Sequence, residues 1–270
     1  MGFIQQRICD ELELATTTVT PREAVQLITY RRLGTNGGLG NQLWQIGATI
    51  GIAASRGESV GFPYWSYRAH FSVPDRYFPD LTGLRTEDLG IDYLQDLALF
   101  EGVADQIRAY FAPPRSLRDR LARRHSALLA QRDCTAIHVR RGDYLRHPEQ
   151  FRVLQMPYYE EAMSQFGPPY LVFSADPDWC RAHFPAECRF LVGNLNYEDL
   201  HLMSTCARFI ISNSTFAWWP AWLSGRPTIA PRRWWGPAWA GLESKMLPDE
   251  WTLLNVSPSL RGRRARISPD

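Results

Sequence analysis

Residues 208–230, RFIISNSTFAWWPAWLSGRPTIA, hold two apolar stretches separated by a polar turn and a Trp-rich segment. The segment 208–212 has the composition of a buried strand, 216–223 that of a helix and 226–230 that of a last strand. A strand, a helix and a strand in so short a segment predict two parallel strands joined by a helical crossover. Ligands bind at the carboxyl ends of such strands, so the polar residues between strand and helix form a candidate site.

The same alternation extends toward the N-terminus as far as residue 134. The sequence predicts further strands at 134–140, 170–174 and 189–192, and helices at 157–166, 177–184 and 197–206. Strands and helices alternating at this spacing predict an α/β fold with a parallel sheet covered on both faces.

The N-terminal half is less regular. Its expected elements are a glycine-rich loop at 35–41, a helix from 39 to Gly57, a strand at 59–65, loops with short elements at 66–115, and a helix at 116–131 capped by Ser116. Thr20–Glu23 has the pattern of a capping box, and Leu27–Tyr30 fits a strand or a helix. We place a domain boundary near residue 130, which gives an N-terminal domain, 1–130, and a C-terminal domain, 131–270.

Composition excludes several classes of protein. The chain has 270 residues, 45% of them hydrophobic and 21% charged, which is ordinary for a folded domain. A net charge of +2 is too balanced for a dedicated nucleic-acid binder, so we expect no nucleic-acid partner. The five cysteines form no C-x-x-C pair, which favours buried free thiols over a zinc or redox site.

The sequence predicts neither a secretory signal nor a spanning helix, so we expect a cytoplasmic protein. The basic tail, 261–270, carries four arginines between Arg261 and Arg266. Such a tail is typical of a solvated terminus, and contact with an anionic membrane surface is the alternative.

The first candidate motif is Gly37-Gly38-Leu39-Gly40-Asn41-Gln42, at the start of the first helix. Glycines let backbone N–H groups approach an anion, and the helix N-terminus adds its positive end. The spacing differs from the dinucleotide and Walker patterns. A tight turn without a ligand explains this motif about as well.

The second motif is His138-Val139-Arg140-Arg141-Gly142-Asp143-Tyr144, at the end of a strand. Strand alternation places His138 and Arg140 on one face, where two groups that can carry positive charge suit a pyrophosphate. Arg141 is expected to pair with Asp143 or to close the turn. A structural Arg–Asp network is the alternative.

The third motif is the polar turn itself, Ser212-Asn213-Ser214-Thr215, followed by Phe216. Hydroxyl and N–H groups at a strand–helix junction form a second anion site, and a helix cap without a ligand is the alternative. Trp218 and Trp219 favour core packing over a sugar-binding wall.

Two carboxylate patterns have structural explanations. Asp176-Pro-Asp178 has the D-x-D spacing of some metal sites, but it lies between a strand and a helix, where a cap is favoured. Asp199 is expected in the first turn of a helix, where the helix dipole stabilises a negative charge. No hydrolase or metalloenzyme motif is present in the sequence.

Taken together, GGLGNQ at 37–42, HVRRGDY at 138–144, and YEDLHLMSTC at 197–206 leading into ISNSTFAWW at 211–219 resemble family 11 glycosyltransferases, the α-1,2-fucosyltransferases. The resemblance runs from about residue 35 to about 235. It implies a GT-B-like fold, with two Rossmann-type domains, parallel sheets and a donor cleft between them. It also implies GDP-fucose as the donor, inversion at the anomeric carbon, and neither a metal nor a cofactor.

The resemblance implies roles for particular residues. Asn41, with Gly38 and Gly40 of its loop, would reach the phosphates, while His138 and Arg140 would hold the diphosphate. Asp199 would bind the guanine. The remaining expected donor contacts are Asn213, Ser214, Thr215 and Phe216. The acceptor is expected on the N-terminal domain, with contacts from Trp65, Tyr67, Arg68, His70 and Asp75.

The chain departs from the family pattern in three respects. Ala175 stands where the family usually has a carboxylate. Trp44 replaces a phenylalanine, with Ile46-Gly47 in place of a Tyr-Ala pair, and the segment before the glycine loop is longer than the family needs. We therefore expect one usual contact near Ala175 to be missing.

For the reaction, we expect Arg140 to stabilise the leaving diphosphate and Asp143 to act as the base, with Glu149 as the alternative base. Two other functions stay open: a glycosyltransferase that uses another nucleotide sugar, and a non-catalytic carbohydrate-binding protein on the same fold.

Overall fold

The computed structural model describes residues 26–90, 92–131, 133–239 and 245–255. Three sequence-based predictions lie outside these residues: the capping box at Thr20–Glu23, the state of Cys9, and the membrane contact of the tail at 261–270.

The larger sheet has six parallel strands in the order β6-β5-β4-β7-β8-β9. They are β4 (Thr135–Val139), β5 (Tyr170–Ser174), β6 (Arg189–Leu191), β7 (Arg208–Ile210), β8 (Thr228–Pro231) and β9 (Thr252–Leu254). After β4, the chain adds β5 and then β6 on one side of it. It then crosses to the other side of β4 and adds β7, β8 and β9 in turn. This is the strand order of Rossmann sheets, in which the point of reversal, here between β4 and β7, is the usual ligand crevice.

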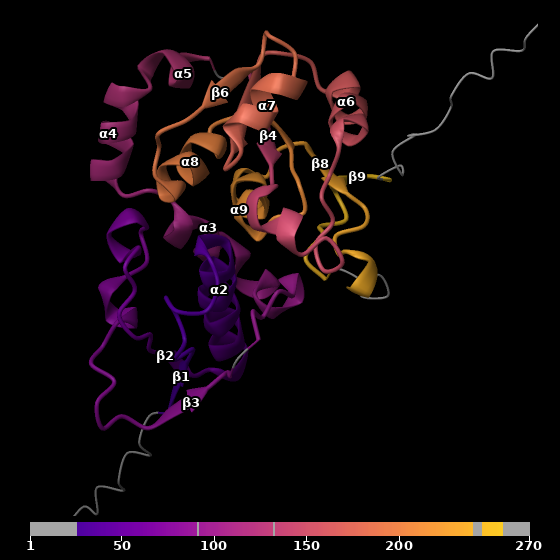
Figure 1. The fold of residues 1–270 in the computed structure, drawn as a ribbon. Helices are drawn as coiled ribbons and strands as arrows, with labels where there is room; N and C mark the ends of the chain where they lie inside the picture. Colours follow the sequence, from indigo (N-terminus) through magenta and orange to yellow (C-terminus); the bar gives the residue numbers. More distant parts are fainter. Residues whose placement is uncertain (1–25, 91, 132, 240–244, 256–270) are drawn as a thin grey trace, which may run out of the picture.

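Helices connect these strands and cover the sheet, as Figure 1 shows. They are α6 (Met156–Gln165), α7 (Pro177–His183), α8 (Asn196–Met203) and α9 (Thr215–Ser224). All five residues of β4 are buried, as expected of a central strand in a sheet with both faces covered. The predicted alternation of strands and helices from residue 134 is therefore confirmed, with shifts of a few residues at the ends.

The smaller sheet has three parallel strands in the order β2-β1-β3: β1 (Leu27–Thr29), β2 (Ser59–Val60) and β3 (Thr86–Asp88). The long helix α2 (Leu39–Arg56) joins β1 to β2. Gly57 ends α2 at φ 66°, a left-handed conformation that favours glycine, and its N–H donates to the carbonyl of Ala54. The predicted helix and its stop are confirmed, and Leu27–Thr29 is a strand.

The two sheets share one hydrophobic core, in which α2 packs against α9. Trp44 of α2 lies 4.4 Å from Trp218 and 5.3 Å from Trp219, measured between ring centroids, and all three are fully buried. Figure 1 shows α2 directly below α9, between the smaller sheet and the larger one. Core packing of the Trp pair is thus confirmed, and this packing fixes the glycine turn at the start of α2 against the larger sheet.

The regions expected to be irregular contain more structure than the sequence pattern predicts. Three elements were not predicted: β3, α3 (Ala104–Phe111), and β9 beyond the expected last strand. Two others differ from the prediction, because β2 has two residues in place of a strand at 59–65, and the expected helix at 116–131 is the pair α4 (Arg115–Arg124) and α5 (Ser126–Ala130). Pro114 is the residue that caps α4, so the prediction of Ser116 as its cap is wrong. The short strands are formed by tertiary pairing, which outweighs weak local propensity.

Short 3-10 helices complete the described chain: η1 (Arg68–His70), η2 (Asp75–Tyr77), η3 (Leu97–Leu99), η4 (Glu101–Val103), η5 (Gly142–Arg146) and η6 (Pro237–Trp239).

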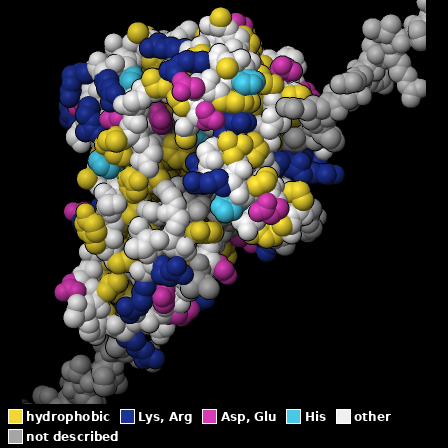
Figure 2. Space-filling view, in the orientation of Figure 1, with side chains coloured by type: hydrophobic (Ala, Val, Ile, Leu, Met, Phe, Trp, Pro, Cys, Tyr) yellow, Lys and Arg dark blue, Asp and Glu magenta, His cyan; other side chains and the backbone are white. Residues whose placement is uncertain are grey.

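The cysteines at 134, 180, 188 and 206 are buried free thiols, as predicted. Among the described helices, none is both long and apolar enough to cross a bilayer. Figure 2 shows acidic and basic side chains interspersed on the visible face, with a group of basic side chains over α4.

Candidate active site at the carboxyl ends of β4 and β7

The second and third motifs meet at the point where the order of the larger sheet reverses. β4 and β7 are hydrogen-bonded neighbours, and each leads directly into one motif. His138 Nδ1 lies 2.8 Å from the Ser212 hydroxyl, which joins the two motifs through their side chains. The sequence predicted that both motifs lie at strand ends, and the topology brings these ends together.

His138 carries no positive charge near neutral pH. Burial, together with the nearby Arg140 guanidinium, lowers the pKa of His138 to about 3. Of the two groups on this strand that can carry positive charge, His138 is thus neutral in the structure near neutral pH. Arg140 supplies the charge, and the neutral imidazole can contribute an N–H donor.

Arg140 and Arg141 each pair with an aspartate, as the alternative of an Arg–Asp network predicts, and the Arg141 carbonyl closes the turn by accepting from the Tyr144 N–H at 2.7 Å. Arg140 Nη2 lies 2.8 Å from Asp143 Oδ1, and its guanidinium lies 5.2 Å from the centre of the Tyr144 ring. Arg141 pairs instead with Asp176, with 3.2 Å between Nε and Oδ2. Arg141 Nη1 and Arg140 Nε are both buried and without a partner among the described residues. Arg140 is one-third exposed, so its guanidinium can reach a ligand while Asp143 orients it.

The polar turn forms the N-terminus of α9. Ser214 occupies the cap position with extended backbone, but no side-chain hydrogen bond caps the helix. The first N–H groups of α9 therefore have no side-chain cap and are available to water or to a ligand, and a helix start without a ligand stays the alternative. Asn213 is 2% exposed, and its amide donates to the Trp234 carbonyl at 2.8 Å, while Tyr144 donates to the Asn213 carbonyl at 2.9 Å. Asn213 thus holds the turn in place. The predicted contact between Asn213 and the sugar-nucleotide donor stays a prediction.

The glycine turn reaches the same site from the smaller sheet. Asn41 Oδ1 accepts hydrogen bonds from the Thr215 hydroxyl at 2.7 Å and from Gln95 Nε2 at 3.1 Å. Two donors on Oδ1 fix the orientation of the Asn41 amide, and its NH2 group lies next to Gly37 of the glycine turn. Gln95 was missed in the sequence because it lies in an irregular segment without periodicity.

Gly40 allows this close approach. A Cβ atom at Gly40 would lie 2.4 Å from the backbone nitrogen of Phe216 and 2.5 Å from the carbonyl carbon of Thr215. The Gly40 carbonyl also accepts a hydrogen bond from Trp219 Nε1 at 2.8 Å. Gly38, in contrast, has open space around the position of a Cβ. The predicted glycine loop is therefore more than a tight turn, because Gly40 packs backbone against backbone.

Asp199 lies in the first turn of α8, next to the end of β6. Burial raises the pKa of Asp199 to about 6, although a hydrogen bond from Asn194 Nδ2 at 2.8 Å opposes this shift. At this pKa the carboxylate is largely ionised at neutral pH, and N–H donors from a ligand would stabilise the anion further.

The other predicted residues divide between structural roles and surface positions. Asp176 caps α7 by accepting from the Trp179 N–H, as predicted. Trp65 is 1% exposed, so the expectation that it contacts an acceptor is wrong. Tyr67 and His70 contact α8: the Tyr67 hydroxyl accepts from Asn196, and His70 stacks on the Tyr197 ring at 3.6 Å.

No group of three or more His, Cys, Asp or Glu residues in the described chain could hold a metal ion. Metal independence itself stays a prediction. Glu149, the alternative base, is exposed. Its own backbone carbonyl accepts a hydrogen bond from the Ala238 N–H at 2.7 Å.

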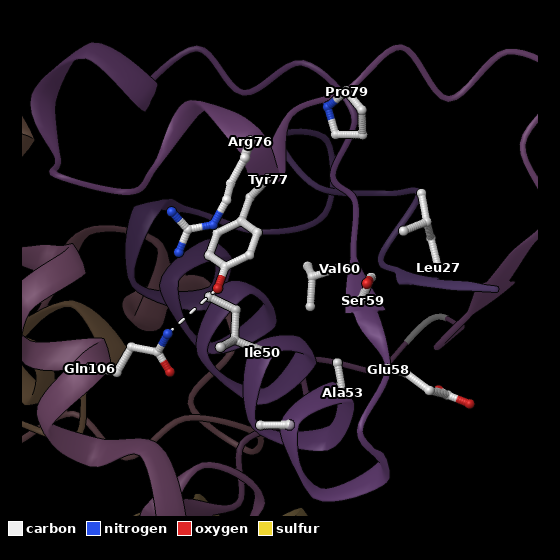
Figure 3. Close-up of a pocket in the computed structure, with 11 residues that line it drawn as sticks. Leu27, Ile50, Ala53, Glu58, Ser59, Val60, Arg76, Tyr77, Pro79 and Gln106 are labelled. Atoms are coloured by element: carbon white, nitrogen blue, oxygen red, sulfur yellow. Dashed lines mark hydrogen bonds between the residues drawn. The ribbon is translucent and has the colours of Figure 1, made fainter. Parts of the chain in front are cut away.

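A hollow of about 450 Å³ lies elsewhere, between the C-terminal half of α2 and β2 (Figure 3). Ile50 and Val60 form its apolar side, and Tyr77 and Gln106 extend toward each other at its edge. Ile50 follows Asn41 by nine residues, which places it about 14 Å further along the helix. This hollow is therefore separate from the site at β4 and β7.

A family model described as glycosyl transferase family 11 matches residues 95–252. This match covers more than half of the chain, so the protein belongs to glycosyl transferase family 11. The α/β fold with two Rossmann-type parallel sheets agrees with the GT-B-like architecture predicted for this family.

Three relatives are similar in sequence. An O-antigen biosynthesis glycosyltransferase, WbnK, of Escherichia coli is 32% identical over 59% of this chain and 58% of its own length. An α-1,2-colitosyltransferase of the same species is 29% identical over 53% of this chain and 55% of its own length. A galactoside α-(1,2)-fucosyltransferase 1 of Lagothrix lagotricha is 25% identical over 88% of this chain and 81% of its own length. The chain thus spans somewhat more than half the length of the two bacterial relatives.

Among solved structures, the NodZ α-1,6-fucosyltransferase soaked with GDP-fucose is similar to this chain, with a TM-score of 0.48 and 12% identity. The similarity covers 73% of this chain and 92% of that chain.

Proposed function

We propose that the protein is an inverting, metal-independent glycosyltransferase that transfers L-fucose from GDP-fucose to a glycan, forming an α-1,2 bond to galactose. One observation carries this proposal. The hydrogen bond between Asn41 and Thr215, at 2.7 Å, joins the glycine turn to the N-terminus of α9. The Arg140 guanidinium lies over the ring of Tyr144, whose hydroxyl donates to the Asn213 carbonyl in the same polar turn. Helix N–H groups, an amide and a guanidinium thus belong to connected segments, and groups of these kinds bind a diphosphate.

Each group has a distinct task in this mechanism. The bond between fucose C1 and the diphosphate oxygen breaks, and its electron pair stays on the diphosphate. Arg140 and the N–H groups at the start of α9 stabilise the charge that develops there. The acceptor oxygen bonds to C1 from the opposite side, and its proton passes to a carboxylate, for which Asp143 is our candidate.

The pairing of Asp143 with Arg140 restricts this last step. In the structure the Asp143 carboxylate contacts the guanidinium at 2.8 Å, so it orients Arg140 before the donor binds. To accept a proton, it has to exchange part of this contact for the acceptor hydroxyl. Once the diphosphate provides anionic oxygens for Arg140, the free-energy cost of separating Asp143 from Arg140 is smaller.

Asp199 provides the base selectivity in this proposal. Guanine presents an N–H and an NH2 group on the edge that a carboxylate can accept from, whereas adenine and uracil offer no such pair. The raised pKa of Asp199 fits a carboxylate that gains stabilisation when such donors arrive.

A thermal-shift series with GDP, UDP, ADP and their sugars tests the proposal. We expect stabilisation by GDP and GDP-fucose, and the same ligands should fail to stabilise Asp199→Asn. A stabilising effect of UDP that exceeds that of GDP would reject the donor assignment.

Transfer of a different sugar is the second candidate, favoured by the similarity to an α-1,2-colitosyltransferase. Product analysis by mass spectrometry, with GDP-fucose and a GDP-colitose donor in competition, separates the two. A product that carries colitose in preference to fucose would select the second candidate, and no product from either donor would favour a binding protein without turnover.

A further inference from the structure

Tyr64 is the most exposed large hydrophobic side chain in the described chain, at 84%. It belongs to the segment that leaves β2, between Phe62 and Trp65, which are 0% and 1% exposed. A ring of this size normally packs at least one face against the protein. A single exposed hydrophobic side chain is common on protein surfaces, so the significance of Tyr64 comes from the two hollows that it lines.

The backbone beside Tyr64 is held on both sides. The Phe62 N–H donates to the Tyr77 carbonyl at 2.7 Å, and the Trp65 indole donates to Gln42 Oε1 at 2.8 Å. Trp65 also stacks on Phe71 with 5.2 Å between ring centroids. The exposure of Tyr64 therefore does not come from a loosely attached loop, and the held backbone fixes the position from which its ring extends.

Two hollows flank the Tyr64 ring, and it lines both. One has a volume of about 350 Å³ and contains Arg31 and Asp80. The other, of about 440 Å³, contains Arg68 and Asp75, whose side chains form an ion pair with 3.2 Å between Nε and Oδ1. Each hollow thus combines one cation with one carboxylate, which disfavours a strongly charged ligand.

The location connects this surface with the candidate active site. Tyr64 follows the carboxyl end of β2, and Arg31 follows that of β1, so both lie at the sheet edge from which the glycine turn departs. The carbonyl of Tyr64 faces Gly34 of that turn. Gln42, the partner of Trp65, is the residue next to Asn41.

We propose that Tyr64 and its two flanking hollows bind a neutral pyranose of the acceptor glycan. A pyranose has a face of C–H groups that can lie on an aromatic ring and a rim of hydroxyls that both donate and accept hydrogen bonds. One Arg and one Asp line each hollow and offer donors and acceptors that sum to no net charge; Arg68 and Asp75 form an ion pair, whereas Arg31 bonds to Thr86 and Asp80 accepts from the Thr82 N–H. This inference deepens the proposed function, on which it rests, by naming the acceptor contact that the sequence did not identify.

The test measures glycan binding without turnover. Saturation-transfer NMR of the GDP-saturated protein is run with methyl β-galactoside, lactose and N-acetyllactosamine, and with a sialylated lactose for comparison. The variants are Tyr64→Ala, Tyr64→Phe and, as a matched control, Leu84→Ala, which removes a 44% exposed apolar side chain that lines neither hollow.

We expect Tyr64→Ala to weaken binding of the neutral glycans by about tenfold or more, because the ring contact is lost. Tyr64→Phe keeps the ring and should stay within about threefold of wild type, and Leu84→Ala should bind like wild type. The thermal shift with GDP should be equal in all four proteins, which shows that the variants fold.

Three results would overturn this inference: wild-type glycan affinity in Tyr64→Ala, selective binding of the sialylated glycan, or no binding of any neutral glycan at millimolar concentration. Failure of the proposed function gives a different result. In that case GDP would not stabilise the wild type, while neutral glycans would still bind in a manner that depends on Tyr64.

Discussion

Gly40→Ala tests whether close backbone contact between α2 and α9 builds the site. The new methyl group would lie 2.4 Å from the Phe216 nitrogen and 2.7 Å from its Cα, so the two helix ends have to separate by about 1 Å to reach van der Waals contact. Backbone atoms cannot rotate away as a side chain can. Overpacking of this kind costs about 1–3 kcal/mol.

The same displacement breaks a hydrogen bond. The Asn41–Thr215 contact, now 2.7 Å, would lengthen beyond hydrogen-bonding distance, at a further cost of about 1 kcal/mol. We expect the free energy of unfolding to fall by about 2–4 kcal/mol in total. For a chain of this size the melting temperature would then fall by roughly 5–15 °C.

Gly38→Ala is the matched control, because a Cβ there meets no atom within 4 Å and the backbone of Gly38 is extended. Its stability should stay within about 1 kcal/mol of wild type. The assay is thermal unfolding with and without GDP, in which Gly38→Ala is the control for stability and the wild type is the control for GDP binding. We expect Gly40→Ala to lose the stabilisation by GDP that the wild type shows. A melting temperature of Gly40→Ala equal to that of Gly38→Ala, together with wild-type GDP affinity in Gly40→Ala, would refute the reasoning.

Three further predictions concern the donor site. Because the pKa of Asp199 is raised to about 6, its carboxylate is charged above that pH and protonated below it. GDP-fucose affinity, measured by calorimetry, should therefore fall about tenfold between pH 7.5 and pH 5, and a flat profile in the wild type would contradict this. Arg140→Ala should lower the transfer rate by at least about a hundredfold with unchanged circular dichroism, whereas near-normal turnover would reject its role. Gln95→Ala removes one of the two donors that orient Asn41, so we expect the KM for GDP-fucose to rise about three- to tenfold with little change in kcat; an effect confined to kcat would argue against a positioning role.

Local sequence signals were sufficient for the strands of the larger sheet from β4 to β8 and for the helices between them. Continuous apolar runs such as 170–174 and capped helices such as the one after Asp176 are specified by residues that are close in the chain. The same holds for the Gly57 stop, because a left-handed residue after a helix strongly favours glycine. Elements of this kind need no distant partner to be recognised.

Distant pairing decided the elements that the sequence did not reveal. β3 and β9 have three residues each and are strands because β1 and β8 lie beside them. His125, where the expected helix at 116–131 divides in two, carries no helix-breaking signal in the sequence. Short strands have weak propensities, so their existence depends on the neighbour with which they pair.

For the site, the sequence by itself determined the groups and their positions at strand and helix ends. It placed Arg140 after one strand, Thr215 after another, and Asn41 at the start of a helix. Tertiary structure alone decided that these three ends meet, that His138 is neutral, that Arg141 turns to Asp176, and that Gln95 orients Asn41. The physical reason is that local patterns fix backbone conformation, whereas charge state and hydrogen-bond partners depend on burial and on atoms contributed by remote segments.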